Sequence, residues 1–120
     1  MNYMDMTMTI QELAQPYTDP DAIKLSHYFL DNGKLLGVCE FYTEDGLRYA
    51  TIRIAGKVAR TEVLIKGVLW HEICHAIPWI ESGHTDGHSS AFQRRLWSRP
   101  RYALLSLFAE FWFGLLDAFN

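Results

Sequence analysis

The chain has 120 residues, a formal net charge of −3 and a hydrophobic content of 49%. This length accommodates one domain, residues 1–120, and excludes a second folded unit, while the apolar content is sufficient for a core without disulfide bonds. Residues 1–45 carry eight acids and two bases (net −6), whereas residues 46–120 carry six acids and nine bases (net +3). Any attraction to polyanions is therefore expected from the second part of the chain.

The use of cysteine indicates a reducing compartment. Cys39 and Cys74 lie far apart, and neither belongs to a C-x-x-C pair, which excludes a zinc ribbon or a dithiol redox motif. Residues 1–10 lack the basic start, apolar stretch and small-residue cleavage site of a signal peptide. We therefore expect an intracellular, cytoplasmic protein.

Two helices are predicted in the first part of the chain. Thr9 to Gln15 favours a short helix that stops at Pro16, because proline interrupts helical hydrogen bonding. Pro20 to Leu30 favours a second helix, with Asp19 as its N-cap and Asn32-Gly33 as its terminator.

Two β-rich runs follow. Lys34–Tyr42 and Leu47–Ala55 are rich in Val, Ile, Thr and aromatic residues, and Glu44-Asp45-Gly46 between them is typical of a turn. Polar and apolar residues alternate partially in the second run, which indicates a sheet covered on one face. These runs predict a small antiparallel sheet.

A long helix is predicted after the sheet. Thr61 to Trp70 has apolar residues at helical spacing, and Pro78 predicts that the helix ends or kinks around Ile77. The polar loop of residues 82–90 then supplies serines that predict an N-cap for a helix from Ala91 to Trp97.

The last predicted helix, roughly Arg99 to Phe119, is strongly apolar from Ala103 onward. It contains Glu110 and Asp117, which are costly in lipid, so a core helix is favoured over a membrane span. Its surplus apolar face is expected to meet the rest of the domain or a second copy of the chain. The predicted fold class is α+β, with a small antiparallel sheet packed on the helix from Thr61 and an apolar C-terminal helix.

The most informative motif is His71-Glu72-Ile73-Cys74-His75, an H-E-x-x-H pattern on the predicted helix. Helical geometry returns His71 and His75 to nearly the same face, so both imidazoles can reach one tetrahedral metal. Glu72 projects beside them, where a carboxylate can take a proton from a water that the metal has acidified. The alternative is a histidine pair that only packs or caps, and the apolar spacing of the preceding turns favours the metal site.

A catalytic zinc site needs a third protein ligand. His88 ranks first, because its loop is long enough to fold back over the metal helix, and His84 of the same loop ranks second. Glu81 takes the place of the third metzincin ligand, but that pattern requires a histidine there and a glycine where this chain has Pro78. Glu110 would complete a gluzincin-type site, since a carboxylate in an apolar stripe needs a partner.

The segment from His71 to Ile80, followed by Asp86-Gly87-His88 and by Phe92, resembles the SprT-like family of zinc metallopeptidases, which includes Spartan. The aromatic-rich stretch from Tyr28 to Leu35 is similar to the helix end before the first strand of that family. The resemblance covers roughly Pro20 to Trp97.

The resemblance implies a zincin-like fold, with His71, His75 and His88 as Zn²⁺ ligands and Glu72 as the general base. It also implies protein substrates, which in this family include DNA-associated proteins. The chain departs from the family at Ser89, where glycine is usual, and at Pro78, and no Cys-rich zinc ribbon follows. We therefore expect no DNA recognition through such a ribbon.

The predicted activity is zinc-dependent hydrolysis of peptide bonds, with Glu72 taking a proton from water and passing it to the leaving amine. Tyr49, Tyr102 and Arg94 are candidates for stabilising the oxyanion. The opposing hypotheses are a gluzincin-type peptidase with a glutamate ligand and a catalytically silent, zinc-stabilised interaction module. A further hypothesis is autoinhibition by the C-terminal helix lying over the cleft.

Four arginines within eight residues form a candidate DNA contact: Arg94, Arg95, Arg99 and Arg101. Together with Trp97 they could follow a phosphate backbone and offer a stacking surface for a base. The alternative is that this run is the solvated end of two helices.

Overall fold

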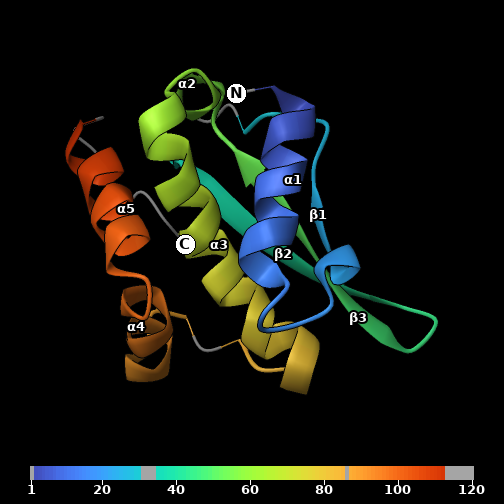
Figure 1. Cartoon of the computed structure of the whole chain (residues 1–120). Helices are drawn as coiled ribbons and strands as arrows, with labels where there is room; N and C mark the ends of the chain where they lie inside the picture. Colours follow the sequence, from blue (N-terminus) through green and yellow to red (C-terminus); the bar gives the residue numbers. More distant parts are fainter. Residues whose placement is uncertain (1, 31–34, 86, 113–120) are drawn as a thin grey trace.

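The computed structural model describes residues 2–30, 35–85 and 87–112. The elements in chain order are α1 (Tyr3–Ala14), the short 3-10 helix η1 (Pro20–Ala22), β1 (Ile23–Leu25), β2 (Gly37–Glu44), β3 (Leu47–Ile54), α2 (Gly56–Ala59), α3 (Glu62–Ser82), α4 (Ser90–Trp97) and α5 (Pro100–Trp112). Helix α3 lies at the centre, with α1 and the sheet on one side and α4 and α5 on the other (Figure 1).

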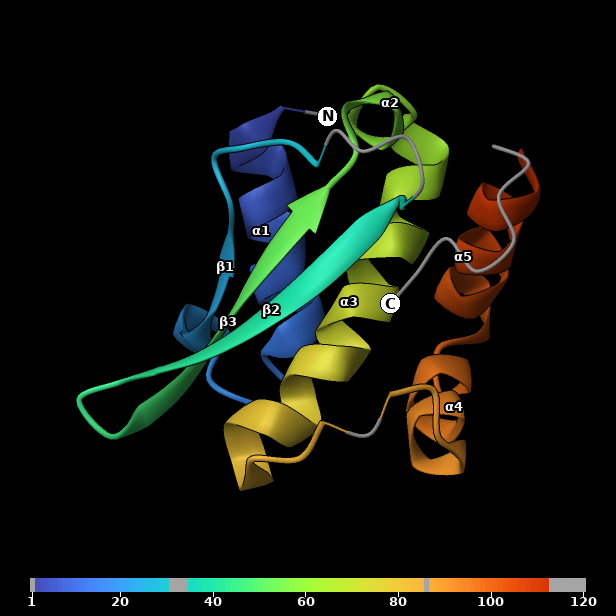
Figure 2. The same cartoon turned by 180° about the vertical axis from the view of Figure 1, so that it is seen from behind.

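The sheet has the strand order β1-β3-β2, and β2 is the edge strand that runs alongside α3 (Figure 2). Strands β2 and β3 form the predicted antiparallel hairpin, with Cys39 opposite Ile52. Asp45 and Gly46 both have positive φ, 53° and 79°, which suits the right-handed twist of a tight hairpin. The predicted α+β class, with an antiparallel pair packed on the central helix, is confirmed.

The predicted helix from Pro20 to Leu30 is wrong. Asp19 caps only the single turn of η1, accepting a hydrogen bond from the Asp21 amide at 3.0 Å. Ile23 and Leu25 are buried and Lys24 between them is exposed, which is the period of a strand. This segment pairs in parallel with β3 and makes the sheet mixed, because the free edge of β3 offers backbone partners that outweigh a local helical preference.

Helix α1 begins earlier than predicted, at Tyr3 rather than Thr9. The Asn2 side chain accepts a hydrogen bond from the Asp5 amide at 2.8 Å and so caps the first turn. Tertiary packing also supports this longer helix, because its buried residues face the sheet and α3; they are Met6, Ile10, Leu13 and Ala14.

Of the two outcomes predicted around Ile77, an end and a kink, the end is wrong: helix α3 continues through Pro78 to Ser82. Proline removes one hydrogen bond of the helix, but contacts with the hairpin hold the last turn. Trp79 Nε1 donates to the Tyr49 carbonyl at 2.8 Å, and Arg48 donates to two carbonyls of that turn. The helix ends instead at Gly83, which has a φ of 73°.

The prediction for the C-terminal region is confirmed in part. Ser89 caps α4 by accepting a hydrogen bond from the Phe92 amide at 3.2 Å, as expected for a serine before this helix. Helix α5 follows to Trp112, and the predicted continuation to Phe119 lies outside the described residues. Within the part of the chain that the structure describes, no helix is long and apolar enough to cross a membrane.

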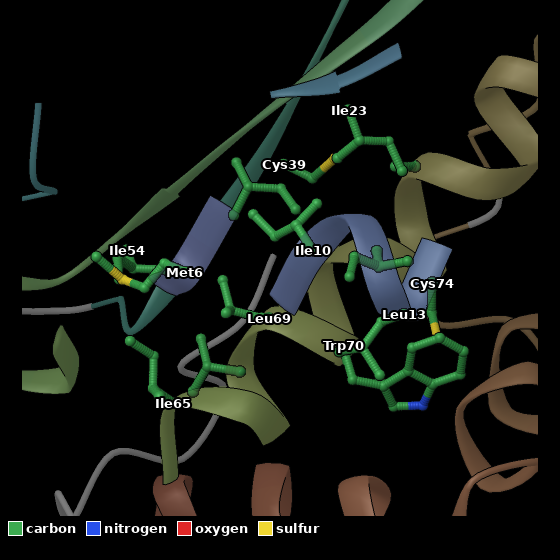
Figure 3. Close-up of a cluster of buried hydrophobic side chains, with 14 of the residues drawn as sticks. Met6, Ile10, Leu13, Ile23, Cys39, Ile54, Ile65, Leu69, Trp70 and Cys74 are labelled. Atoms are coloured by element: carbon green, nitrogen blue, oxygen red, sulfur yellow. The ribbon is translucent and has the colours of Figure 1, made fainter. Parts of the chain in front are cut away.

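The core lies between the sheet, α1 and α3 (Figure 3). Its labelled members come from both helices and from all three strands: Met6, Ile10, Leu13, Ile23, Cys39, Ile54, Ile65, Leu69, Trp70 and Cys74. On the opposite side of α3, Gly67 permits close approach of α5. A Cβ atom at Gly67 would lie 2.5 Å from the Leu105 carbonyl carbon, so the two helices touch through backbone.

Candidate metal centre

Three histidines form one group on the side of α3 that faces α4. His71 and His75 are one turn apart on α3, and His88 comes from the loop between α3 and α4. One ligand atom of each lies within 4.8 Å of the others, and Nε2 of His71 is 3.2 Å from Nε2 of His88. Three imidazoles that converge in this way are a ligand set that suits Zn²⁺ with a position left for water.

The protonation state of His71 also suits a metal ion. His71 is buried, and burial lowers its pKa well below the ordinary value; nearby His75 and His88 lower it further. A neutral imidazole is the form that binds a metal, so the lowered pKa favours the form of His71 that can act as a ligand. The residues present therefore fit the Zn²⁺ ion that the motif predicts.

Phe92 of α4 supports all three imidazoles from one side. Its ring centroid lies 4.9 Å from that of His71, 4.4 Å from that of His75 and 5.1 Å from that of His88. Phe92 is 1% exposed, and Ser89 holds its backbone through the N-cap. The sequence identified Phe92 only as part of a motif, whereas the structure shows that it packs against every histidine of the group.

The loop before His88 is held at its start. Arg48 of β3 donates through Nε to the Ile80 carbonyl at 3.1 Å and through a terminal nitrogen to the Glu81 carbonyl at 3.0 Å. These bonds cap the end of α3, and Gly83 then turns the chain in a left-handed conformation. The end of α3 thus sets the starting direction of the loop that carries His88.

The other ligand candidates do not join the group. Among the described residues that could hold a metal ion, the cluster consists of His71, His75 and His88. His84 is exposed at the start of the loop, and Glu81 is exposed on the last turn of α3. Glu110 of α5 is half-buried and lines a hollow of about 220 Å³ beside His71 and His88.

Glu72 is fully buried between α3 and β2. Its side chain is 0% exposed, and among the described residues neither carboxylate oxygen has a hydrogen-bond partner. Burial raises the pKa of Glu72 well above its ordinary value. A buried carboxyl group with a raised pKa that adjoins a metal-ligand motif is a candidate for proton transfer.

The candidates for stabilising an oxyanion lie elsewhere. Two hollows adjoin the histidines, and within the described residues neither is lined by Tyr49, Tyr102 or Arg94. The Tyr49 ring stacks on Tyr42 at 5.5 Å between centroids, and Tyr102 packs against the core. The sequence therefore offered no useful signal for this role.

One of the four arginines proposed for DNA contact, Arg99, has side-chain partners in the fold. The Arg99 guanidinium lies 4.8 Å from the centre of the Trp70 ring and 5.3 Å from that of Tyr17, and Arg99 Nε donates to the Tyr17 hydroxyl at 3.4 Å. Arg95 is half-buried, whereas Arg94 and Arg101 are exposed.

The chain is similar to one known family. The model of the SprT-like family matches residues 8–98, so the chain belongs to this family. No curated protein and no solved structure matches the chain. Membership is compatible with a metallopeptidase, and the match spans the histidine group, β2 and β3.

Proposed function

We propose that this protein is a zinc-dependent metallopeptidase that hydrolyses peptide bonds in protein substrates. The observation that carries the proposal is the convergence of His71, His75 and His88 beside the buried Glu72. Two imidazoles and the carboxylate come from one helix, and the third imidazole comes from the following loop. This is the ligand number of a catalytic zinc site rather than of a closed structural site, which has four protein ligands.

Zinc held by the three imidazoles supplies Lewis acidity toward a carbonyl oxygen and a water molecule. Glu72 then acts as the general base, taking the proton of the attacking water and delivering it to the leaving amine. The raised pKa of Glu72 lets the carboxyl group hold that proton between the two steps. Phe92 keeps the imidazoles in place and excludes water from their far side.

The edge strand β2 provides a place for the substrate backbone. Within the described residues β2 pairs only with β3, so its outer edge offers free amide and carbonyl groups. An extended peptide can add to such an edge through backbone hydrogen bonds. A hollow of about 150 Å³ lies between this strand and the histidine loop, and its lining residues are Cys39, Phe41, His75, Thr85 and Gly87.

Metal analysis tests the ligand set. The purified wild type is expected to hold one zinc per chain, and His88→Ala is expected to lose it. His84→Ala serves as the matched control, because His84 belongs to the same loop but not to the cluster. Zinc retained by the His88 variant and lost by the His84 variant would overturn the assignment.

Proteolysis tests the activity. Wild-type protein is expected to cleave an unfolded protein substrate, and Glu72→Gln is expected to keep zinc and lose cleavage by a factor of about 10² or more. Equal behaviour of the two proteins would instead favour the opposing hypothesis of a zinc-stabilised interaction module. The gluzincin-type alternative predicts zinc loss in a Glu110→Gln variant.

Location and partners stay predictions. Cys39 and Cys74 are both unpaired, which supports the proposed cytoplasmic setting. Self-association through α5 is supported by its exposed apolar side chains, which are Leu104, Leu107, Phe108, Phe111 and Trp112. DNA contact is supported by Arg94 and Arg101, which are exposed beside Trp97.

A further inference from the structure

We propose that Gly37 is a positioning residue for Glu72. Because glycine has no side chain, this point of β2 leaves the space in which the Glu72 carboxylate lies. The proposal rests on the proposed peptidase function, since it assigns a role to the neighbour of the general base. Gly37 is the first residue of β2 and pairs with Ile54 of β3.

The space around Gly37 is already occupied by Glu72. A Cβ atom at Gly37 would lie 3.0 Å from Glu72 Oε2 and 3.2 Å from Glu72 Cγ. It would also lie 3.0 Å from Cγ1 of Val68, one turn earlier on the same face of α3. Ordinary carbon contacts are about 3.5–4.0 Å, so a side chain at this position would force one of these groups to move.

The backbone conformation does not itself require glycine here. Among the described residues, positive φ values occur at Asp45, Gly46, Gly83 and Gly87, and Gly37 is not one of them. Gly37 has ordinary strand pairing, so alanine could adopt its φ and ψ angles. The requirement for glycine is therefore one of space beside Glu72.

Glu72 is the group that would move first. Val68 is 0% exposed, and its branched side chain is packed inside the core. Glu72 is also 0% exposed, but none of the described residues hydrogen-bonds to its carboxylate oxygens and holds them in place. A Cβ atom at residue 37 would therefore displace the carboxylate from the place where it acts as a base.

The first experiment compares Gly37→Ala with Gly56→Ala. Gly56 is the matched control, because a Cβ atom there would have no neighbour closer than 3.9 Å. Gly37→Ala is expected to lower kcat by about tenfold or more while zinc content and KM stay within about twofold of wild type. Gly56→Ala is expected to leave all three unchanged. An unchanged kcat in Gly37→Ala, or a loss of zinc that accounts for its fall, would overturn the proposal.

The second experiment asks whether the effect passes through Glu72. In a Glu72→Gln background, where the base is already absent, Gly37→Ala is expected to cause no further fall in the residual rate. A further tenfold fall would show that residue 37 acts by another route and would overturn the proposal.

The third experiment needs no activity and uses metal-free protein. Gly37→Ala is expected to lower the melting temperature in the wild-type background and to lower it by less than half as much in a Glu72→Ala background, where the carboxylate is gone. If the Gly37→Ala protein folds only in the Glu72→Ala background, that result would also support the contact between residue 37 and Glu72. An equal fall in melting temperature in both backgrounds, or failure to fold in both, would assign Gly37 a general structural role and overturn the proposal.

If wild type proves inactive on every substrate, the proposed function fails, whereas this stability cycle still decides whether Gly37 and Glu72 are in contact.

Discussion

Replacing Glu72 with glutamine should stabilise the metal-free protein at neutral pH. Glu72 is fully buried, and within the described residues its carboxylate accepts no hydrogen bond, so folding removes the charged group from water without compensation. A buried polar group without a partner costs about 1–3 kcal/mol, and more when it is charged. Glutamine has nearly the same shape and no charge, so it should recover part of this cost.

The pH dependence follows from the direction of the pKa shift. Burial raises the pKa of Glu72 in the folded protein above its ordinary value of 4.5, so the folded state keeps its proton to a higher pH than the unfolded chain. The contribution of Glu72 to stability is therefore fully present below pH 4.5 and is lost as the pH rises through the folded pKa. Glutamine does not titrate, so the advantage of Glu72→Gln should grow from acid to neutral pH.

Another titrating group of the site affects both proteins equally. The pKa of His71 is lowered, so its contribution to stability is present above its ordinary value of 6.5 and is lost as the pH falls through the folded pKa. Because wild type and Glu72→Gln both contain His71, the difference between their curves isolates Glu72.

Thermal unfolding of chelator-treated protein, followed by circular dichroism between pH 4 and pH 8, measures this difference. A gain of about 1–3 kcal/mol corresponds to roughly 3–15 °C in melting temperature for a domain of this size. Glu81→Gln is the control, because Glu81 is exposed on the same helix and should change stability little. A Glu72→Gln variant that is no more stable than wild type at pH 7.5, or that shows the same gain at pH 4, would refute the reasoning.

Two further predictions concern packing and DNA. Gly67→Ala places a methyl group against the backbone of α5, so it should lower the free energy of unfolding by about 1–3 kcal/mol in a denaturant titration. Gly56→Ala, whose methyl group would have no neighbour closer than 3.9 Å, should not. Binding of single-stranded DNA in a gel shift should weaken when Arg94 and Arg101 are both replaced by alanine, with the salt slope reduced by about 1.4. Arg99→Ala should instead lower the melting temperature through the loss of its ring contacts, and a binding loss without a stability loss in that variant would contradict this division.

The local parts of the fold could be predicted from the sequence. The hairpin of β2 and β3 depends on alternating β-branched residues and on the turn at Asp45-Gly46, which neighbouring residues determine. The start of α4 depends on Ser89, whose side chain bonds to an amide three residues later. Such interactions lie within a few residues, so the sequence alone contains them.

The parts that were mispredicted depend on contacts between distant residues. The helix expected over Pro20 to Leu30 gives way to β1, because β3, which follows some 20 residues later, supplies its backbone partners. Helix α3 passes Pro78 because Trp79 and Arg48 join its last turn to the hairpin. Neither interaction can be predicted from the helix or strand propensity of the neighbouring residues.

For the candidate site, the sequence by itself determined the spacing of His71, Glu72 and His75, because helical geometry puts one turn between the two imidazoles whatever the rest of the chain does. It ranked His88 before His84, but loop length alone permitted both. Only the tertiary structure decided which histidine joins the cluster, since Phe92 and the anchored end of α3 determine where the loop returns. Tertiary structure alone also placed Gly37 next to Glu72, because packing sets the distance between a strand and a helix, and the sequence of neither segment determines it.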